Sequence, residues 1–293
     1  MTRPLSPEEM FPARAAGVAA RRLMLSTGVC VRVAESGPAD GAPVVMLHGW
    51  GASVYTFRHA LEAFPTQALR AIAVDLRGFG LSERPIARGA YTTDAYRADL
   101  DALLDALQLE RAALMGHSMG GGVALHYALR TPGRVTALAL INPIGLVSIG
   151  ALYAMRGVPR QLMELIGERL VPRWVVEFVL ERLAFGDPSL VTPQDVDEYW
   201  APTQVPGFMR GLRGSIDEFD WHPLTGREAA GLTIPSVVIL GSQDRLVRGA
   251  RRAAERLRGA RVYTVPGGHC VNEERPGEVH EILGSFIRAH LPP

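Results

Sequence analysis

Short apolar segments that recur along the chain constrain its fold more than any other feature. Segments of this kind are not amphipathic, so they belong in a sheet that is covered on both faces. Helical patterns of apolar residues lie between several of them. This alternation predicts an α/β fold with a mostly parallel central sheet flanked by helices. The six candidate strands are Val44–Leu47, Ala71–Leu76, Ala112–Met115, Val135–Ile141, Val237–Leu240 and Arg261–Val265.

The N-terminal part has a different pattern. Residues 1–20 are expected to form a loose arm. Arg22–Leu25 and Val29–Glu35, joined by a Ser-Thr-Gly turn, predict a β-hairpin. Further along, apolar residues at helical spacing predict a helix that is capped by Thr93, and a second helix over residues 247–257.

The alternation of strand and helix stops between residues 143 and 230. This segment contains helical patterns but no convincing strand, and Thr192-Pro193-Gln194-Asp195 has the composition of a helix start. We therefore expect a core domain of residues 1–142 and 231–293. Residues 143–230 would form an all-helical cap, or lid, over a site.

An uncharged stretch runs between Arg134 and Arg156, and it is long enough to span a bilayer. Asn142-Pro143 and Gly145 interrupt it, however. The pattern therefore favours a buried strand followed by an apolar lid segment from Leu146 to Met155, and no stable membrane insertion.

Composition excludes several classes of function. The chain has 31 basic and 30 acidic residues, so its net charge of +1 argues against a nucleic-acid binder. Every basic residue is arginine, which excludes mechanisms that need a Schiff-base or P-loop lysine. Cys30 and Cys270 match neither a disulfide framework nor a zinc site, and the N-terminus has no apolar signal segment. We expect a cytoplasmic protein without a metal or organic cofactor.

The segment Gly116-His117-Ser118-Met119-Gly120 contains the pattern G-x-S-x-G. It follows the predicted strand Ala112–Met115 and precedes a helical pattern, which is the context of a nucleophile elbow. The residues at 116, 120, 121 and 122 need to be small because the turn is sharp and the helix packs close to the sheet, and all four are glycine. Ser118 is therefore the candidate nucleophile.

A serine hydroxyl needs a base, and the base needs an acid that fixes its tautomer. His269 follows the last apolar segment, where α/β sheets place their ligands. Asp244 follows the segment before it, 25 residues upstream of His269. His48 and Asp75 also follow strands, but we interpret His48 as a hydrogen-bonding turn residue and Asp75 as an acid that structures its loop.

The oxyanion of an acyl-transfer reaction needs donors that are already in place. The N–H of Met119 qualifies because this residue follows the nucleophile. The second donor is expected from the loop after Val44–Leu47, at the N–H of Trp50, because Gly49 and Gly51 let that backbone approach closely.

Together these motifs resemble the α/β-hydrolase superfamily, in its serine-nucleophile, esterase/lipase-like branch with a helical cap after the sixth strand. The resemblance covers residues 22–290. Ser118 departs from the haloalkane dehalogenases and soluble epoxide hydrolases, which use a carboxylate nucleophile. Carbon–carbon hydrolases usually have Trp where this chain has Cys270, and Asn where it has His117.

The resemblance implies a serine hydrolase of a carboxylic ester or lactone, acting through an acyl-enzyme intermediate on a small, apolar substrate. Alternatives are a carbon–carbon bond hydrolase or perhydrolase with the same triad, and a ligand-binding protein on a hydrolase scaffold. Aromatic residues of the expected cap could line an apolar pocket. They are Trp174, Phe178, Tyr199, Trp200, Phe208 and Trp221.

Overall fold

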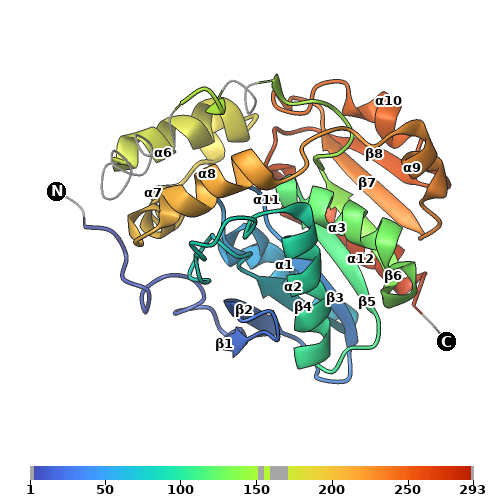
Figure 1. The fold of residues 1–293 in the computed structure, drawn as a ribbon, viewed down its shortest axis with the longest axis horizontal. Coiled ribbons are helices and arrows are strands. Elements are labelled where there is room, and N and C mark those ends of the chain that lie inside the picture. The colour runs from blue at the N-terminus through green and yellow to red at the C-terminus, as the bar shows by residue number, and fades with distance from the viewer. Residues whose placement is uncertain (1–2, 151–154, 159–170, 292–293) are drawn as a thin grey trace.

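The structure confirms the expected α/β architecture, with one mostly parallel sheet of eight strands. This architecture is seen in a computed structural model that describes residues 3–150, 155–158 and 171–291 (Figure 1). The strand order is β1-β2-β4-β3-β5-β6-β7-β8. The strands are β1 Ala19–Met24, β2 Cys30–Ser36, β3 Ala42–Leu47, β4 Leu69–Val74, β5 Ala112–His117, β6 Val135–Ile141, β7 Ser236–Gly241 and β8 Arg261–Val265.

The predicted hairpin is confirmed: β1 and β2 pair antiparallel, and β2 also pairs antiparallel with β4. All other neighbours in the sheet are parallel. The carboxyl ends of β3 to β8 therefore share one edge of the sheet, and the loops that carry Ser118, Asp244 and His269 leave from that edge.

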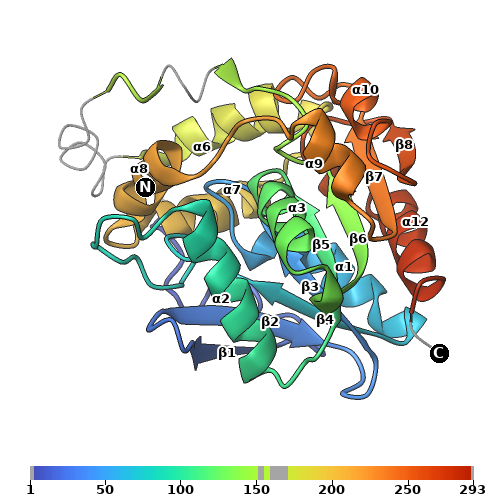
Figure 2. The same cartoon turned by 45° about the vertical axis from the view of Figure 1, so that its right-hand side comes forward.

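Apolar strands form here because both faces of the sheet are covered. Along β3, Val45 and Leu47 belong to one hydrophobic cluster, whereas Val44 and Met46 belong to the other. Residues of α2 (Thr93–Ala106), α3 (Met119–Arg130) and α10 (Ala250–Ala254) complete the first cluster. Residues of α1 (Arg58–Ala63) and α12 (Pro276–Arg288) complete the second, so helices lie on both sides of the sheet (Figure 2).

Helices dominate the described part of residues 143–230, and no strand occurs in that part. The capping box of Thr192 and Asp195 at the start of α7 is confirmed. Helices α6, α7 and α8 gather on one side of the sheet (Figure 1). The helices are α6 Arg173–Val179, α7 Pro193–Trp200, α8 Phe208–Glu218 and α9 Gly226–Gly231.

The apolar lid segment expected over Leu146–Met155 lies partly outside the described residues, which omit 151–154. None of the helices that are described has the length and apolar character needed to cross a membrane.

The prediction of a loose N-terminal arm is wrong. The main-chain N–H of Phe11 donates to both carboxylate oxygens of Glu198 in α7, at 3.0 Å each. The carbonyl of Phe11 accepts from Arg32 of β2 at 3.0 Å, and the Phe11 ring packs edge-on against Tyr55. Met10 is buried. The arm is therefore held between the sheet and the helical segment.

Two helix boundaries also differ from expectation. Thr92, not Thr93, is the N-cap of α2, because its hydroxyl accepts from the N–H of Ala95. The helix expected over residues 247–257 is reduced to α10, Ala250–Ala254, which is flanked by turns, with Gly249 in the left-handed region just before it. The ends of a short helix that is flanked by turns are poorly marked in the sequence, which explains why the predicted helix is too long.

Candidate active site

Ser118 occupies a sharp turn between β5 and α3. Its backbone has φ 51° and ψ −117°, a strained combination for a residue with a side chain. Its N–H donates to the carbonyl of Ile141 in the neighbouring strand at 3.0 Å, which anchors the turn. The turn needs glycine nearby: a Cβ on Gly116 would lie 2.5 Å from Gly121 Cα, and one on Gly121 would lie 2.6 Å from Pro143.

His269 and Asp244 are brought together as predicted. The distance from His269 Nδ1 to Asp244 Oδ2 is 2.7 Å, and both side chains are nearly fully buried. The other oxygen, Oδ1, accepts from the N–H groups of Leu246 at 2.7 Å and Val247 at 3.2 Å. Burial acts to raise the pKa of Asp244, but the hydrogen bond and charge of His269 outweigh it, so this pKa lies below its ordinary value.

An ionised carboxylate can only accept a hydrogen bond, so Asp244 requires that His269 carries a proton on Nδ1. This contact therefore fixes the tautomer of His269. Nε2 of His269 is left with its lone pair and can take a proton. The residue before the serine, His117, contacts this ring, with the two ring centroids 4.9 Å apart. Ser118, His269 and Asp244 thus all lie in loops at the same edge of the sheet, and they are the residue types that acyl transfer uses.

His48 and Asp75 have structural hydrogen bonds instead. His48 Nε2 accepts from the N–H of Leu76 at 3.0 Å, while Nδ1 lies 2.7 Å from the carbonyl of Gly49. Burial lowers the pKa of His48, so the ring is neutral and Nδ1 is the donor. This geometry confirms that His48 is a hydrogen-bonding turn residue.

Asp75 is fully buried. Its carboxylate accepts from Arg32 Nε at 2.6 Å and from the N–H groups of Val54 and Leu81, both at 2.7 Å. Both carboxylate oxygens of Asp75 therefore accept hydrogen bonds from neighbouring residues of the fold, as expected for an acid that structures its loop.

The loop after β3 approaches the serine closely. A Cβ on Gly49 would lie 3.2 Å from Ser118 Cβ. The indole Nε1 of Trp50 donates to the carbonyl of Leu212 at 3.1 Å and to Ser215 Oγ at 3.0 Å, so α8 holds this loop. Met119 is the first residue of α3, where the helix leaves N–H groups without an intrahelical partner. Both expected donors therefore lie on segments next to Ser118.

The six aromatic residues expected to line a pocket lie in different surroundings. Trp221 and Phe208 pack in the core cluster of the sheet. Trp200 donates from Nε1 to the carbonyl of Val171. The Tyr199 hydroxyl donates to Glu273 at 2.6 Å. Trp174 and Phe178 are 66% and 54% exposed.

Some polar residues near the site were not predicted from the sequence. Asn142 follows β6 and donates to the loop of His269. The rule that selected Asp244, a polar residue in the loop after an apolar strand, would also have found Asn142. Glu274 accepts from Gly268 N–H at 2.6 Å and from Gly186 N–H at 2.9 Å, which ties the His269 loop to the helical segment. No sequence signal marks Glu274.

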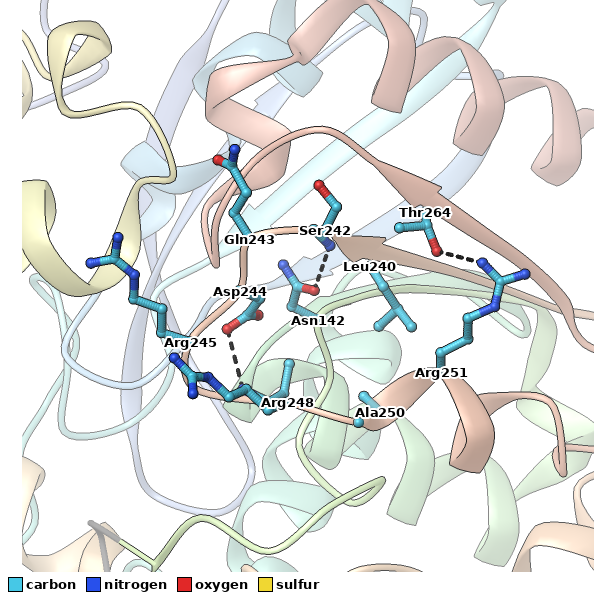
Figure 3. A pocket seen from close by; sticks show the side chains of 13 residues that line it. Asn142, Leu240, Ser242, Gln243, Asp244, Arg245, Arg248, Ala250, Arg251 and Thr264 are labelled. Carbon is cyan, nitrogen blue, oxygen red and sulfur yellow. Dashed lines mark hydrogen bonds between the residues drawn. The ribbon is translucent and has the colours of Figure 1, made fainter.

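A surface groove of about 530 Å³ is lined by Asp244 and by the segment that follows β7. Asp244, Asn142, Arg245, Arg248 and Arg251 are among the residues that line it (Figure 3). The three arginines are exposed to solvent. Among the residues that the structure describes, no group of His, Cys, Asp or Glu side chains could hold a metal ion.

Comparison with known proteins gives matches over nearly the whole chain. The family described as alpha/beta hydrolase fold matches residues 42–276. Epoxide hydrolase A of Mycobacterium tuberculosis (strain ATCC 25618 / H37Rv) is 31% identical over 317 residues, which cover 92% of this chain and 98% of the relative.

A second relative has a different activity. The 2-hydroxymuconate semialdehyde hydrolase of Pseudomonas sp. (strain CF600) is 38% identical over 279 residues, 91% of this chain and 93% of that protein. Among solved structures, epoxide hydrolase CorEH without ligand matches with a TM-score of 0.80 at 25% identity, covering 93% of this chain and 99% of the other. The chain is therefore similar to hydrolases of more than one substrate class.

Proposed function

Because this chain belongs to the alpha/beta hydrolase family, we propose that it is a serine hydrolase that cleaves a carboxylic ester or lactone. The observation that carries the proposal is the pairing of His269 with Asp244 at 2.7 Å beside the strained turn of Ser118. We further propose that residues 143–230 form a cap over the substrate, which is a small molecule with an apolar acyl or ring group.

The proposed reaction has two halves. Ser118 Oγ attacks the carbonyl carbon while His269 Nε2 takes its proton, and the N–H groups of Met119 and Trp50 stabilise the oxyanion. The ester C–O bond then breaks, and His269 gives the proton to the leaving alkoxide. Water attacks the acyl-enzyme with His269 again as base, which releases the acid and restores Ser118. Asp244 orients the imidazole and stabilises its charged form throughout.

The nucleophile argues against epoxide hydrolysis, although a relative has that name. A carboxylate that opens an epoxide forms an ester, which water can cleave. Ser118 would form an ether instead, and an ether has no carbonyl that water could attack. A serine at this position therefore suits an acyl group.

A carbon–carbon bond hydrolase is the second candidate. It is supported by the 38% identity to 2-hydroxymuconate semialdehyde hydrolase. Cleavage next to a ketone also presents a carbonyl to Ser118 and an oxyanion to the same donors. Cys270 and His117 remain the departures from that class.

The test is hydrolysis of p-nitrophenyl esters from acetate to palmitate by the wild type and by Ser118→Ala. We expect turnover by the wild type and a loss of about 10⁴-fold or more in the variant. The matched control is Ser236→Ala, which removes a buried serine hydroxyl in β7 that donates to the carbonyl of Ile234. It should leave turnover unchanged.

Full turnover by Ser118→Ala would refute a serine mechanism. If the wild type cleaves no ester of the series but cleaves a vinylogous 1,5-diketone, the second candidate replaces the first.

A further inference from the structure

The main-chain carbonyl oxygen of His269 accepts two hydrogen bonds from side chains. Asn142 Nδ2 donates at 2.8 Å and His117 Nε2 donates at 2.9 Å. Asn142 is fully buried and His117 is 3% exposed, so water does not compete for either bond. The backbone of His269 is therefore held from two directions, separately from the bond between its ring and Asp244.

The side-chain amide of Asn142 makes hydrogen bonds through both its oxygen and its nitrogen. Its Oδ1 accepts from the N–H of Gly241 at 2.9 Å, which fixes which end of the amide is the donor (Figure 3). Its Nδ2 then reaches Gly268 O at 3.1 Å as well as His269 O. Asn142 has φ 41°, in the left-handed region that Asn tolerates better than most residues. One side chain thus connects the ends of β6, β7 and β8.

His117 connects the loop of His269 to the turn of Ser118. Burial and the neighbouring His269 lower the pKa of His117 to about 3, so its ring is neutral at working pH. A carbonyl oxygen can only accept, so Nε2 carries the proton. Because Ser118 is the next residue in the chain, this bond links the backbone beside the nucleophile to the backbone of the base.

We propose that His117 and Asn142 are positioning residues that set the separation between Ser118 Oγ and the His269 imidazole by fixing the carbonyl oxygen of His269. The proposal rests on the roles of Ser118 and His269 in the proposed function. Proton transfer depends steeply on this separation, since a displacement of about 1 Å costs roughly 100-fold in rate. Neither residue touches the substrate or exchanges a proton.

Two separate variants, His117→Gln and His117→Asn, test the proposed role of His117. Gln carries its N–H₂ near the position of Nε2 and can reach His269 O, whereas the shorter Asn cannot. We expect His117→Asn to lower kcat by about 10- to 100-fold, and His117→Gln to stay within about threefold of the wild type. KM and the pH profile should not change, because one neutral side chain replaces another. Equal kcat values for the two variants would overturn the role of His117.

Asn142→Asp tests the proposed role of Asn142. Aspartate keeps the shape and the tolerance of a left-handed backbone, but its carboxylate cannot donate to Gly268 O or His269 O. We expect kcat to fall by about 10- to 100-fold. For the His117 variants, the control for loss of a nearby histidine is His126→Leu, because His126 lies in α3 against Phe219. Unchanged kcat in Asn142→Asp would overturn the role of Asn142.

A measurement without ester turnover separates this proposal from the proposed function. An alkyl phosphonofluoridate forms a bond from Ser118 Oγ to phosphorus and releases fluoride, while His269 takes the serine proton. No labelling of the wild type would refute the activated serine itself. Rapid labelling of the wild type, with equally rapid labelling of His117→Asn and Asn142→Asp, would refute only the positioning role. We expect the two variants to be labelled about 10- to 100-fold more slowly, at a melting temperature that shows a folded chain.

Discussion

Two aspartates that each follow a parallel strand have different surroundings, and this difference decides their tasks. Asp75 meets the guanidinium of Arg32 and two backbone N–H groups. Asp244 has one oxygen on backbone N–H groups and the other on His269. The first aspartate can stabilise only the fold, whereas the second can also orient a base.

Substitution to Asn should therefore affect different properties at the two positions. Asp75→Asn breaks a buried ion pair, and we expect a loss of about 3–5 kcal/mol in unfolding free energy with kcat of the folded protein unchanged. Asp244→Asn should lower kcat by about 10⁴-fold, because the amide can no longer fix the tautomer of His269. Urea unfolding and ester hydrolysis measure the two effects. The reverse pattern would assign the acid of the triad to Asp75.

At the scale of elements, the packing of α3 against the sheet explains most of the glycines around Ser118. A Cβ on Gly120 would overlap the carbonyl oxygen of Leu47, and one on Gly121 would overlap Pro143. At Gly122 there is room for a methyl group. A Cβ there would meet Ile144 and Phe219 at 3.4 Å, which is ordinary van der Waals contact.

Alanine substitutions within α3 should therefore have opposite effects. Gly120→Ala and Gly121→Ala should each lower the unfolding free energy by about 1–3 kcal/mol, because a methyl group is forced into packed atoms. Gly122→Ala should be neutral, or stabilise by up to about 1 kcal/mol, since Ala favours a helix over Gly. Thermal melts of the three variants, with Gly133→Ala outside the helix as a control, test this. Equal losses at 121 and 122 would contradict it.

Individual strands and loops differ in how well the sequence predicts them. Strands β6 and β8 have the predicted bounds, although β6 is buried along its whole length and only Val265 of β8 is. The pairing of Asp244 with His269 follows from parallel strands that end at one edge. Glu274 and the exposure of Trp174 could not be predicted, because they depend on how residues 143–230 lie against the core, and no local pattern encodes that arrangement.

At the scale of the whole molecule, buried histidines make the fold sensitive to acid. Burial lowers the pKa values of His117 and His280 to about 3 in the folded chain, from an ordinary value of 6.5. Below pH 6.5 the unfolded chain binds protons that the folded chain does not. The unfolding free energy therefore falls as the pH drops from 6.5 towards 3, by roughly 1.4 kcal/mol per pH unit for each histidine.

The prediction is a loss of about 2 kcal/mol per buried histidine between pH 7.5 and pH 5. His280→Leu should reduce that loss by about this amount, because it removes one of the titrating groups. His222→Asn, at an exposed position, should leave most of the pH dependence in place. Urea unfolding at the two pH values measures the difference. Identical pH dependence in His280→Leu and the wild type would contradict this account.

The main chain of Phe11, bonded on one side to Glu198 and on the other to Arg32, makes the N-terminal arm part of two modules at once. A grafted helical segment without a carboxylate at position 198 would leave the Phe11 N–H without this acceptor. Residues 3–18 and α7 are therefore structurally coupled, although more than a hundred residues of the chain separate them in the sequence. Chimeras that exchange both segments together should keep the arm in place, and those that exchange only the helices should release it.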